Sequence, residues 1–526
     1  MEYSKTEQEI LLHFFTNLDK RVFIAKNIHP EIWALLQAQY SRSKEGLRER
    51  FLKTLKNDKE SYKKLVEAVE TKELDNIALI KAEEKAQNFL SEWGLKYGHG
   101  SIIEGAIVGI GVEDISIFEA KTIEDNRLSS FTEKSTRYVD FGLKQFHIPK
   151  EIRGTEVEKE YLEIMNYLFD TYTILNSIVL SDIQDKIPFD IIKHGDKKVW
   201  ERSCRSRCFD STRYILPVGA KTSLGWTVNA RELEHAIVKM LSHPWKVIRD
   251  LGEELKEEAK KILKSSLEFA NECDYLIETN KIMPDVINGF LKAHGVKELE
   301  YEIEDRVTLV NTTADPENFM IASVINSYSE LSFENSFKLS RDLTPEKKEE
   351  IFDNFMNKMG NFDAPLRQLE NVYFTFDIVM DYGAWRDLQR QRMCTQTVPH
   401  PTNGYGFEIP EDIDSTKSID MYTNAVELAN NFSNKIKKDY PETAAMVLPL
   451  GNNIRYSVTM NIREVYYMCK LRTSPQSHYS YRNVVLDMYD IMKNKYPLLM
   501  KYAKIRFDGE ALGRLRQEQQ AQKPKM

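Results

Sequence analysis

Cysteine is scarce in this sequence, and its distribution argues against a disulfide-stabilised protein. The 526 residues contain five cysteines, which are Cys204, Cys208, Cys273, Cys394 and Cys469. Only Cys204 and Cys208 lie close together, in ERSCRSRCFD. With no second cysteine or histidine pair nearby, two cysteines in a helix are a better interpretation than a zinc site. We therefore predict no disulfide framework and no metal site.

Long apolar runs and excess positive charge are also missing. No apolar run approaches the roughly 20 residues that a membrane-spanning helix needs, and the N-terminal MEYSKTEQEI lacks the basic-then-apolar pattern of a signal peptide. The net charge of −8 counts against a protein that coats nucleic acid by charge. No glycine-rich dinucleotide fingerprint stands out. We expect a cytoplasmic protein that binds neither membranes nor nucleic acids.

What the chain does contain is an internal repeat. LPVGAKTSLGWTVNARELEH (216–235) and LPLGNNIRYSVTMNIREVYY (448–467) share a Leu-Pro pair, a short strand and Asn-x-Arg-Glu at the start of a helix. Further upstream, Glu104 aligns with Glu370 and Arg127 with Arg392. The ordered matches indicate two homologous domains.

The repeat and the length, which is too great for one hydrophobic core, suggest the domain boundaries. We predict a first domain over 1–250, a charged helical connector over 251–302 and a second domain over 303–526. Hydrophobic periodicity predicts helices and strands in both domains, hence an α+β fold. The expected helices are 157–179, 230–241 and 253–269, and the expected strands are 223–228 and 456–460.

The segment DNRLSSFTEKSTRY (125–138) gathers polar side chains that suit a phosphorylated small molecule. They are Arg127, Ser130, Glu133, Ser135 and Arg137. Arginine binds phosphate oxygens in a bidentate way, and hydroxyl groups can donate to the remaining acceptors. A solvated loop with an internal ion pair between an arginine and Glu133 is the alternative interpretation.

These motifs resemble the flavin-dependent thymidylate synthases. HGSIIEG (99–105), RLSSFTEKSTRY (127–138), RYILP (213–217) and TVNARELEH (227–235) follow the order of that family's motifs, whose signature is RHRxxSxNExSxR. The first copy departs from the signature at Asp125, Asn126 and Thr132. The second copy, RQRMCTQTVPHPT, keeps Arg390 and Arg392 and then diverges.

The resemblance implies a fold, a reaction and a set of site residues. It implies two tandem copies of a twisted antiparallel sheet flanked by helices, and methylation of deoxyuridine monophosphate with FAD, NADPH and methylenetetrahydrofolate. The implied catalytic residues are Arg127, Arg137 and His99, and the implied substrate-binding residues are Ser130, Glu133, Ser135, Arg137, Arg213 and Arg472. The implied cofactor-binding residues are His99, Ser101, Arg127, Arg390, Arg392, Asn229, Arg231, His235, Asn461 and Arg463.

Several of these residues have plainer interpretations. A loop histidine without a functional role is an equally good interpretation of His99. Asn229 is a favoured helix cap, although the repeat at Asn461 weakens that explanation because capping does not require the arginine that follows. Glu104 could simply orient a neighbouring arginine.

Each copy lacks a residue of the family pattern that the other copy retains. The first copy has Met240 where the second has Arg472, and the second has Ala445 where the first has Arg213. Because the family's sites lie between the subunits of homotetramers, we expect the two halves to form a pseudo-dimer with a composite pocket. Two chains would then form a homodimer that mimics the tetramer. Two alternatives remain: a divergent paralogue that binds a pyrimidine nucleotide but acts on another substrate or is non-catalytic, and, least favoured, a nucleic-acid-binding protein.

Overall fold

A computed structural model describes residues 3–40, 43–57, 59–71, 100–295, 305–507 and 510–522. The chain forms two compact units, each assembled from separate stretches of sequence. Unit 1 comprises Met1–Glu113, Leu128–Glu133 and Ser223–Val296, and unit 2 comprises Asp114–Arg127, Lys134–Thr222 and Lys297–Met526. The fold is α+β, as predicted, with antiparallel strand pairs and many helices.

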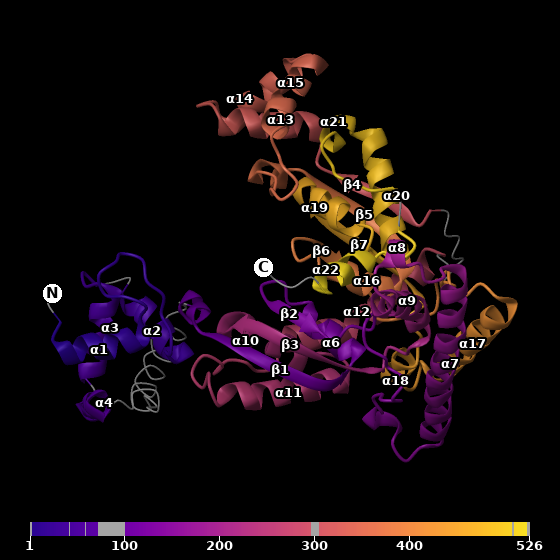
Figure 1. The fold of residues 1–526 in the computed structure, drawn as a ribbon, viewed down its shortest axis with the longest axis horizontal. Helices are drawn as coiled ribbons and strands as arrows, with labels where there is room; N and C mark the ends of the chain where they lie inside the picture. The colour runs from indigo at the N-terminus through magenta and orange to yellow at the C-terminus, as the bar shows by residue number, and fades with distance from the viewer. Residues whose placement is uncertain are drawn as a thin grey trace. The chain divides into compact units, whose positions relative to one another are not determined.

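Unit 1 combines an N-terminal helical cluster with a small sheet (Figure 1). The cluster consists of α1 (Lys5–Phe14), α2 (Pro30–Tyr40), α3 (Leu47–Asn57) and α4 (Lys59–Thr71), which enclose a core rich in leucine and phenylalanine. The three strands have the order β1 (Ile107–Ser116), β3 (Lys221–Asn229) and β2 (Ser130–Glu133). The short helix η3 (Gly100–Gly105) precedes β1, and α10 (Ala230–Leu241), α11 (Lys246–Lys260) and α12 (Asp274–Ala293) follow β3.

Unit 2 begins with helices that belong to the first sequence half. They are α6 (Ile117–Glu124), η4 (Lys150–Ile152), α7 (Glu156–Lys186), α8 (Ile191–His194), α9 (Lys197–Thr212) and η5 (Arg213–Ile215). Among the described residues, no helix of the chain is long and apolar enough to span a bilayer.

The remainder of unit 2 is the second sequence half, built on a four-stranded antiparallel sheet. The strands have the order β4 (Val307–Thr312), β5 (Tyr373–Asp381), β7 (Asn453–Asn461) and β6 (Thr395–Thr397). Its helices are α13 (Pro316–Ser327), α14 (Phe333–Asp342), α15 (Pro345–Met356), η6 (Arg367–Asn371), α16 (Tyr382–Gln389), α17 (Thr416–Ile436), α18 (Pro441–Met446), α19 (Ile462–Arg472), α20 (Tyr479–Lys495), α21 (Pro497–Met500) and α22 (Leu515–Gln522).

Most of the expected elements are present, and one helix is shorter than predicted. The helices expected at 157–179 and 230–241 correspond to α7 and α10, and both expected strands lie within β3 and β7. The helix predicted over 253–269 ends instead at Lys260. The reason is tertiary: the backbone N–H groups of Ser265 and Ser266 donate to the buried Glu31 carboxylate at 3.2 and 3.1 Å. Such contacts override local helix propensity.

The two sequence halves meet in unit 2 through a symmetric set of backbone hydrogen bonds. Pro217 and Pro449 form an antiparallel bridge. Each hydrogen bond around this bridge has an equivalent in which the donor and the acceptor come from the opposite repeats. Val218 N–H donates to Leu448 O and Leu450 N–H to Leu216 O, both at 2.9 Å, while Gly219 N–H donates to Met446 O at 2.7 Å and Gly451 N–H to Tyr214 O at 2.8 Å. This is the self-complementary pattern of a two-fold interface. Figure 1 also shows α7 beside α17, and these helices are in contact.

Gly451 at this junction has no room for a side chain. A Cβ atom there would lie 2.1 Å from the Tyr422 hydroxyl and 3.2 Å from the Tyr214 carbonyl oxygen. We expect Gly451→Ala to lower the free energy of unfolding by about 1–3 kcal/mol, the usual cost of overpacking. Urea unfolding of Gly225→Ala provides the control, because no atom lies within 4 Å of a Cβ added there. Equal midpoints for the two variants would contradict the prediction.

Candidate functional site

Unit 2 contains a cavity of about 240 Å³ to which both sequence halves contribute. Its lining is dominated by six arginines: Arg137, Arg213, Arg386, Arg390, Arg472 and Arg514. Hydroxyl and amide side chains complete the wall, including Ser135, Ser477 and Gln476. A cavity with this composition favours an anionic ligand rich in hydrogen-bond acceptors.

Helix ends bring three of the six arginines into the cavity. Arg213 directly follows α9, Arg390 follows α16, and Arg472 is the last residue of α19. Their helices begin with side-chain caps: in α16, the Asp381 carboxylate accepts from the Ala384 N–H at 2.6 Å. Capping defines where each helix begins, and the length of the helix then places the arginine at its far end.

Asp387 is the carboxylate around which the arginines gather. Its oxygens lie 3.7 Å from Arg213 Nη2, 3.9 Å from Arg390 Nη1 and 4.0 Å from Arg472 Nη1. Burial alone raises the pKa of Asp387, but the field of the surrounding arginines, which include Arg137, outweighs burial and lowers this pKa below its usual value. Asp387 is thus ionised at neutral pH and offsets only part of the positive charge.

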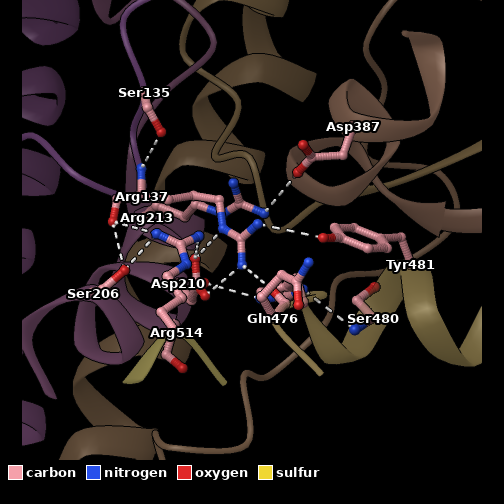
Figure 2. Close-up of polar contacts among 12 residues, drawn as sticks. Ser135, Arg137, Ser206, Asp210, Arg213, Asp387, Gln476, Ser480, Tyr481 and Arg514 are labelled. Atoms are coloured by element: carbon pink, nitrogen blue, oxygen red, sulfur yellow. Dashed lines mark hydrogen bonds and ion pairs between the residues drawn. The ribbon is translucent and has the colours of Figure 1, made fainter. Parts of the chain in front are cut away.

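A second carboxylate, Asp210, holds Arg137 in a bidentate pair (Figure 2). Arg137 Nη2 donates to Asp210 Oδ2 at 2.7 Å, and Arg137 Nε donates to the other carboxylate oxygen. Arg137 Nη1 also donates to the Tyr481 hydroxyl at 3.3 Å. Burial raises the pKa of Asp210, but attraction to Arg137 and hydrogen bonds from it lower the pKa overall. Arg137 is therefore fixed between residues of both halves and does not belong to a solvated loop.

Arg213 is deeply buried, and part of its guanidinium lacks a hydrogen-bond acceptor among the described residues. The residue is only 2% exposed, and within the part of the chain that the structure describes, its Nε and Nη2 groups have no hydrogen-bond partner. Buried polar groups are normally satisfied, since leaving one unpaired costs about 1–3 kcal/mol. Because Arg213 also lines the cavity, its guanidinium suits a ligand that supplies acceptor oxygens.

Arg472 is oriented by Gln391, the residue that replaces the signature histidine in the second copy. With its amide oriented to satisfy both sides, the Gln391 oxygen accepts from Arg472 Nε and Nη2, each at 2.9 Å. The Gln391 nitrogen donates to Glu464 at 2.7 Å. Burial raises the pKa of Glu464 to about 7, although Arg472 and Arg463 oppose this shift.

Glu464 should give the chain a pH-dependent stability. Because its pKa is higher in the folded chain than the ordinary value of 4.5, the folded state binds more protons, and the free energy of unfolding should fall as pH rises from about 4.5 to 7. The contribution is about 1.4 kcal/mol for each unit of pKa difference. We expect Glu464→Gln to flatten this decline in urea unfolding curves. An unchanged slope in the variant would contradict the assignment.

The structure brings together five residues singled out from the sequence. Ser135, Arg137, Arg213, Arg390 and Arg472 all line the cavity.

Arg127 and Arg392 are not among the lining residues. Both are exposed in unit 2, and Arg127 Nη1 donates to the carbonyl oxygen of Cys394 at 3.2 Å. The two arginines occupy equivalent positions of the repeats, so this contact joins corresponding loops.

The repeated Asn-x-Arg-Glu motif has a structural role in each half. In unit 2, Asn461 accepts from the Glu464 N–H at 2.9 Å, and Arg463 forms an ion pair with Glu370. In unit 1, Asn229 likewise accepts from the Glu232 N–H at 3.0 Å, and Arg231 pairs with Glu104 at 2.5 Å. The plainer interpretations of the asparagines and of Glu104 thus describe contacts that are present.

The remaining sequence candidates belong to unit 1 or lie outside the described residues. Ser130 and Glu133 lie on β2, opposite Thr227 and Leu224 of β3. His235 is exposed on α10. His99 lies outside the described residues, and Ser101 is placed in η3 without a described side chain.

Sequence reasoning missed Arg386, Asp387, Asp210 and Arg514. Arg386 and Asp387 lie in WRDLQRQR, next to the recognised arginines, so charge density was an available signal. Asp210 and Arg514 lie outside the signature motifs, and no spacing pattern distinguishes them.

Four of the five cysteines, which are Cys204, Cys208, Cys394 and Cys469, are not activated thiols. Cys204 and Cys208 lie in α9, as expected for helix residues, and burial raises the pKa of their thiols to about 11 and about 12. Burial also raises the pKa of the Cys394 and Cys469 thiols. Thiolates are the reactive form, so these side chains are poor nucleophiles.

Comparison with known proteins places the chain in a family. The family model described as thymidylate synthase complementing protein matches residues 61–263 and 308–498, two segments that are consistent with a tandem duplication. A UPF0159 protein from Chlamydia muridarum is 30% identical over 98% of both chains. A UPF0159 protein from Thermoplasma acidophilum is 26% identical over 83% of this chain and 92% of its own. A flavin-dependent thymidylate synthase from Clostridium tetani is 26% identical over 36% of this chain and 72% of its own. With two matches that together cover more than half of its length, the chain belongs to the thymidylate synthase complementing protein family.

Proposed function

We propose that the chain is a thymidylate synthase-like enzyme that binds deoxyuridine monophosphate in the arginine-lined cavity and methylates it. The observation that carries the proposal is the convergence of Arg137 and Arg213 from the first half with Arg390 and Arg472 from the second. The family match and the flavin-dependent thymidylate synthase relatives support the reaction class.

The cavity offers distinct partners for the phosphate and the base. The guanidinium of Arg213, which lines the cavity, would donate to phosphate oxygens, a strong charge-assisted contact. Ser135 and the Gln476 side chain provide neutral donors and acceptors for the pyrimidine edge. Arginines next to the uracil ring would stabilise negative charge that develops on it during reaction.

Three arginines also supply guanidinium groups that suit a flavin diphosphate. Arg127 and Arg392 are exposed on corresponding loops, and Arg390 lines the cavity with its side chain about half exposed. These three residues would hold the phosphates of FAD. The bound flavin would supply hydride transfer, with NADPH as reductant and methylenetetrahydrofolate as one-carbon donor. In a homodimer, the second chain would extend this surface.

A second candidate keeps the nucleotide but not the reaction. Asn126 and Gln391 replace the signature histidine, and both are buried. Asn126 donates to the Ile123 carbonyl oxygen at 2.8 Å, and Gln391 lies between Arg472 and Glu464. Since both side chains have structural partners, the chain could instead bind a pyrimidine nucleotide and act on another substrate or have no catalytic role.

Three measurements test these two functions. The methylating enzyme should be purified with flavin absorbance, bind deoxyuridine monophosphate and rescue a thymidine auxotroph. Binding without flavin and without rescue favours the second candidate. A chain that binds no pyrimidine nucleotide contradicts both.

A further inference from the structure

We propose that the C-terminal segment 510–522 forms part of the nucleotide pocket, with Arg514 as a positioning residue for Arg137. The segment lies beyond residue 498, where the family match ends. The inference rests on the proposed function, because it assigns to Arg514 a preference for the phosphorylated form of the ligand. It adds a contributor that lies outside both repeats.

The segment is docked on unit 2 by specific contacts at both of its ends. A Cβ atom on Gly513 would lie 2.2 Å from the Pro475 carbonyl oxygen, so the two backbones touch in a way that only glycine permits. Near the other end, Glu518 pairs with Arg202 of α9 at 2.8 Å. Gln519 Nε2 donates to the His194 carbonyl oxygen at 3.1 Å. The segment is therefore part of the folded unit.

Between these contacts, the Arg514 side chain lies beside Arg137 and hydrogen-bonds to the Arg137 carbonyl oxygen and to Ser206 (Figure 2). Its guanidinium lies 4.0 Å from the centre of the Tyr138 ring, a cation–π distance. Arg514 Nη1 donates to the Arg137 carbonyl oxygen at 3.4 Å and to Ser206 Oγ at 2.5 Å. Arg514 Nη2 lies 3.7 Å from Asp210 Oδ1. One side chain thus touches Arg137, its neighbour and its counterion.

This arrangement explains how Arg137 can act on a ligand although it is paired with Asp210. Asp210 carries one negative charge and is shared by two guanidinium groups, so it neutralises neither completely. The Arg514 side chain is 7% exposed, and the low dielectric of such a site strengthens the shared interaction. Arg514 therefore keeps Arg137 oriented and leaves net positive charge facing the cavity.

The chemical consequence is selectivity for a phosphate group. A nucleoside monophosphate carries charge that a nucleoside lacks, and only the charged ligand gains from the potential that Arg137 and Arg514 create together. Contacts with the sugar and base do not depend on that potential. Loss of Arg514 should therefore weaken monophosphate binding selectively.

Calorimetric titration of the full-length chain tests this inference. We expect Arg514→Gln to weaken binding of deoxyuridine monophosphate at least 10-fold while binding of deoxyuridine changes less than 2-fold. Arg514→Lys, which keeps the charge, should recover part of the loss. Arg516→Gln is the matched control, because Arg516 belongs to the same segment, is largely exposed and pairs with Glu510. Monophosphate affinity that is unchanged in Arg514→Gln, or a loss that is equal for both ligands, overturns the inference.

A second measurement separates this inference from the proposed function. Hydrogen exchange of the ligand-free chain reports directly on the positioning of residues 134–139. We expect at least 3-fold faster exchange there in Arg514→Gln and no change in Arg516→Gln. Unchanged exchange in Arg514→Gln overturns the positioning role even if the nucleotide binds. If exchange is faster in Arg514→Gln but the parent chain binds no deoxyuridine monophosphate, the positioning role stands and the proposed function is refuted.

Discussion

Replacing Arg213 by glutamine is expected to weaken deoxyuridine monophosphate binding about 100-fold while the free energy of unfolding stays equal or rises. A hydrogen bond to a charged group contributes about 1.5–3 kcal/mol, and 1.4 kcal/mol corresponds to about a tenfold change in affinity. The free energy of unfolding should not fall, because the Nε and Nη2 groups of Arg213 are buried without a hydrogen-bond partner among the described residues. Removing one of six clustered arginines also reduces their mutual repulsion.

Calorimetric titration and urea unfolding of the same preparation check both parts of this prediction. Arg367→Gln serves as the control, because Arg367 is exposed in the same unit and pairs with Glu370 at 3.1 Å. That variant should match the parent in affinity. A large fall in the unfolding midpoint of Arg213→Gln would show that its ion pair with Asp387 stabilises the fold, and unchanged affinity would exclude Arg213 from the ligand site.

The sequence predicted residue types better than it predicted their partners. Arg137 could be identified because clustered guanidinium and hydroxyl groups suit a phosphate, whereas Arg213 and Arg472 were identified from the resemblance to the family's motifs. Strands such as β7 were predictable because alternating side chains must face a core on one side. These features depend on neighbours that are close in the chain.

Features that depend on distant neighbours could not be predicted in this way. Asp210 binds Arg137 across 73 residues, and nothing in ERSCRSRCFD distinguishes this aspartate from a surface residue. The helix expected to continue past Lys260 ends there instead. In the segment that follows, Ser265 and Ser266 donate to Glu31, which is more than 200 residues away in sequence. Local pattern cannot encode such contacts, because they exist only once the chain has folded.

The second large effect concerns Arg137 and Arg472, which come from different repeats and line the same cavity. We expect Arg137→Lys and Arg472→Lys each to weaken deoxyuridine monophosphate binding about 30-fold, because lysine keeps the charge but loses the planar fork. Lysine at 137 can still pair with Asp210, which avoids leaving a buried carboxylate alone. The two losses should not be additive, since Arg137 donates to the Tyr481 hydroxyl and Arg472 lies 5.5 Å from the centre of the same ring.

Co-expression of the two single variants then asks whether the site is built within one chain. If Arg137 and Arg472 act within the same chain, every chain in the mixture carries one defect, and titration should find no high-affinity sites. If the site instead joins Arg137 of one chain to Arg472 of another, mixed dimers contain one intact site, and part of the high-affinity binding returns. Co-expression of the parent with the double variant is the control, and it should retain high-affinity sites in proportion to the parental chains. Because the paired carboxylates and Tyr481 connect both arginines within unit 2, the first outcome is the one expected.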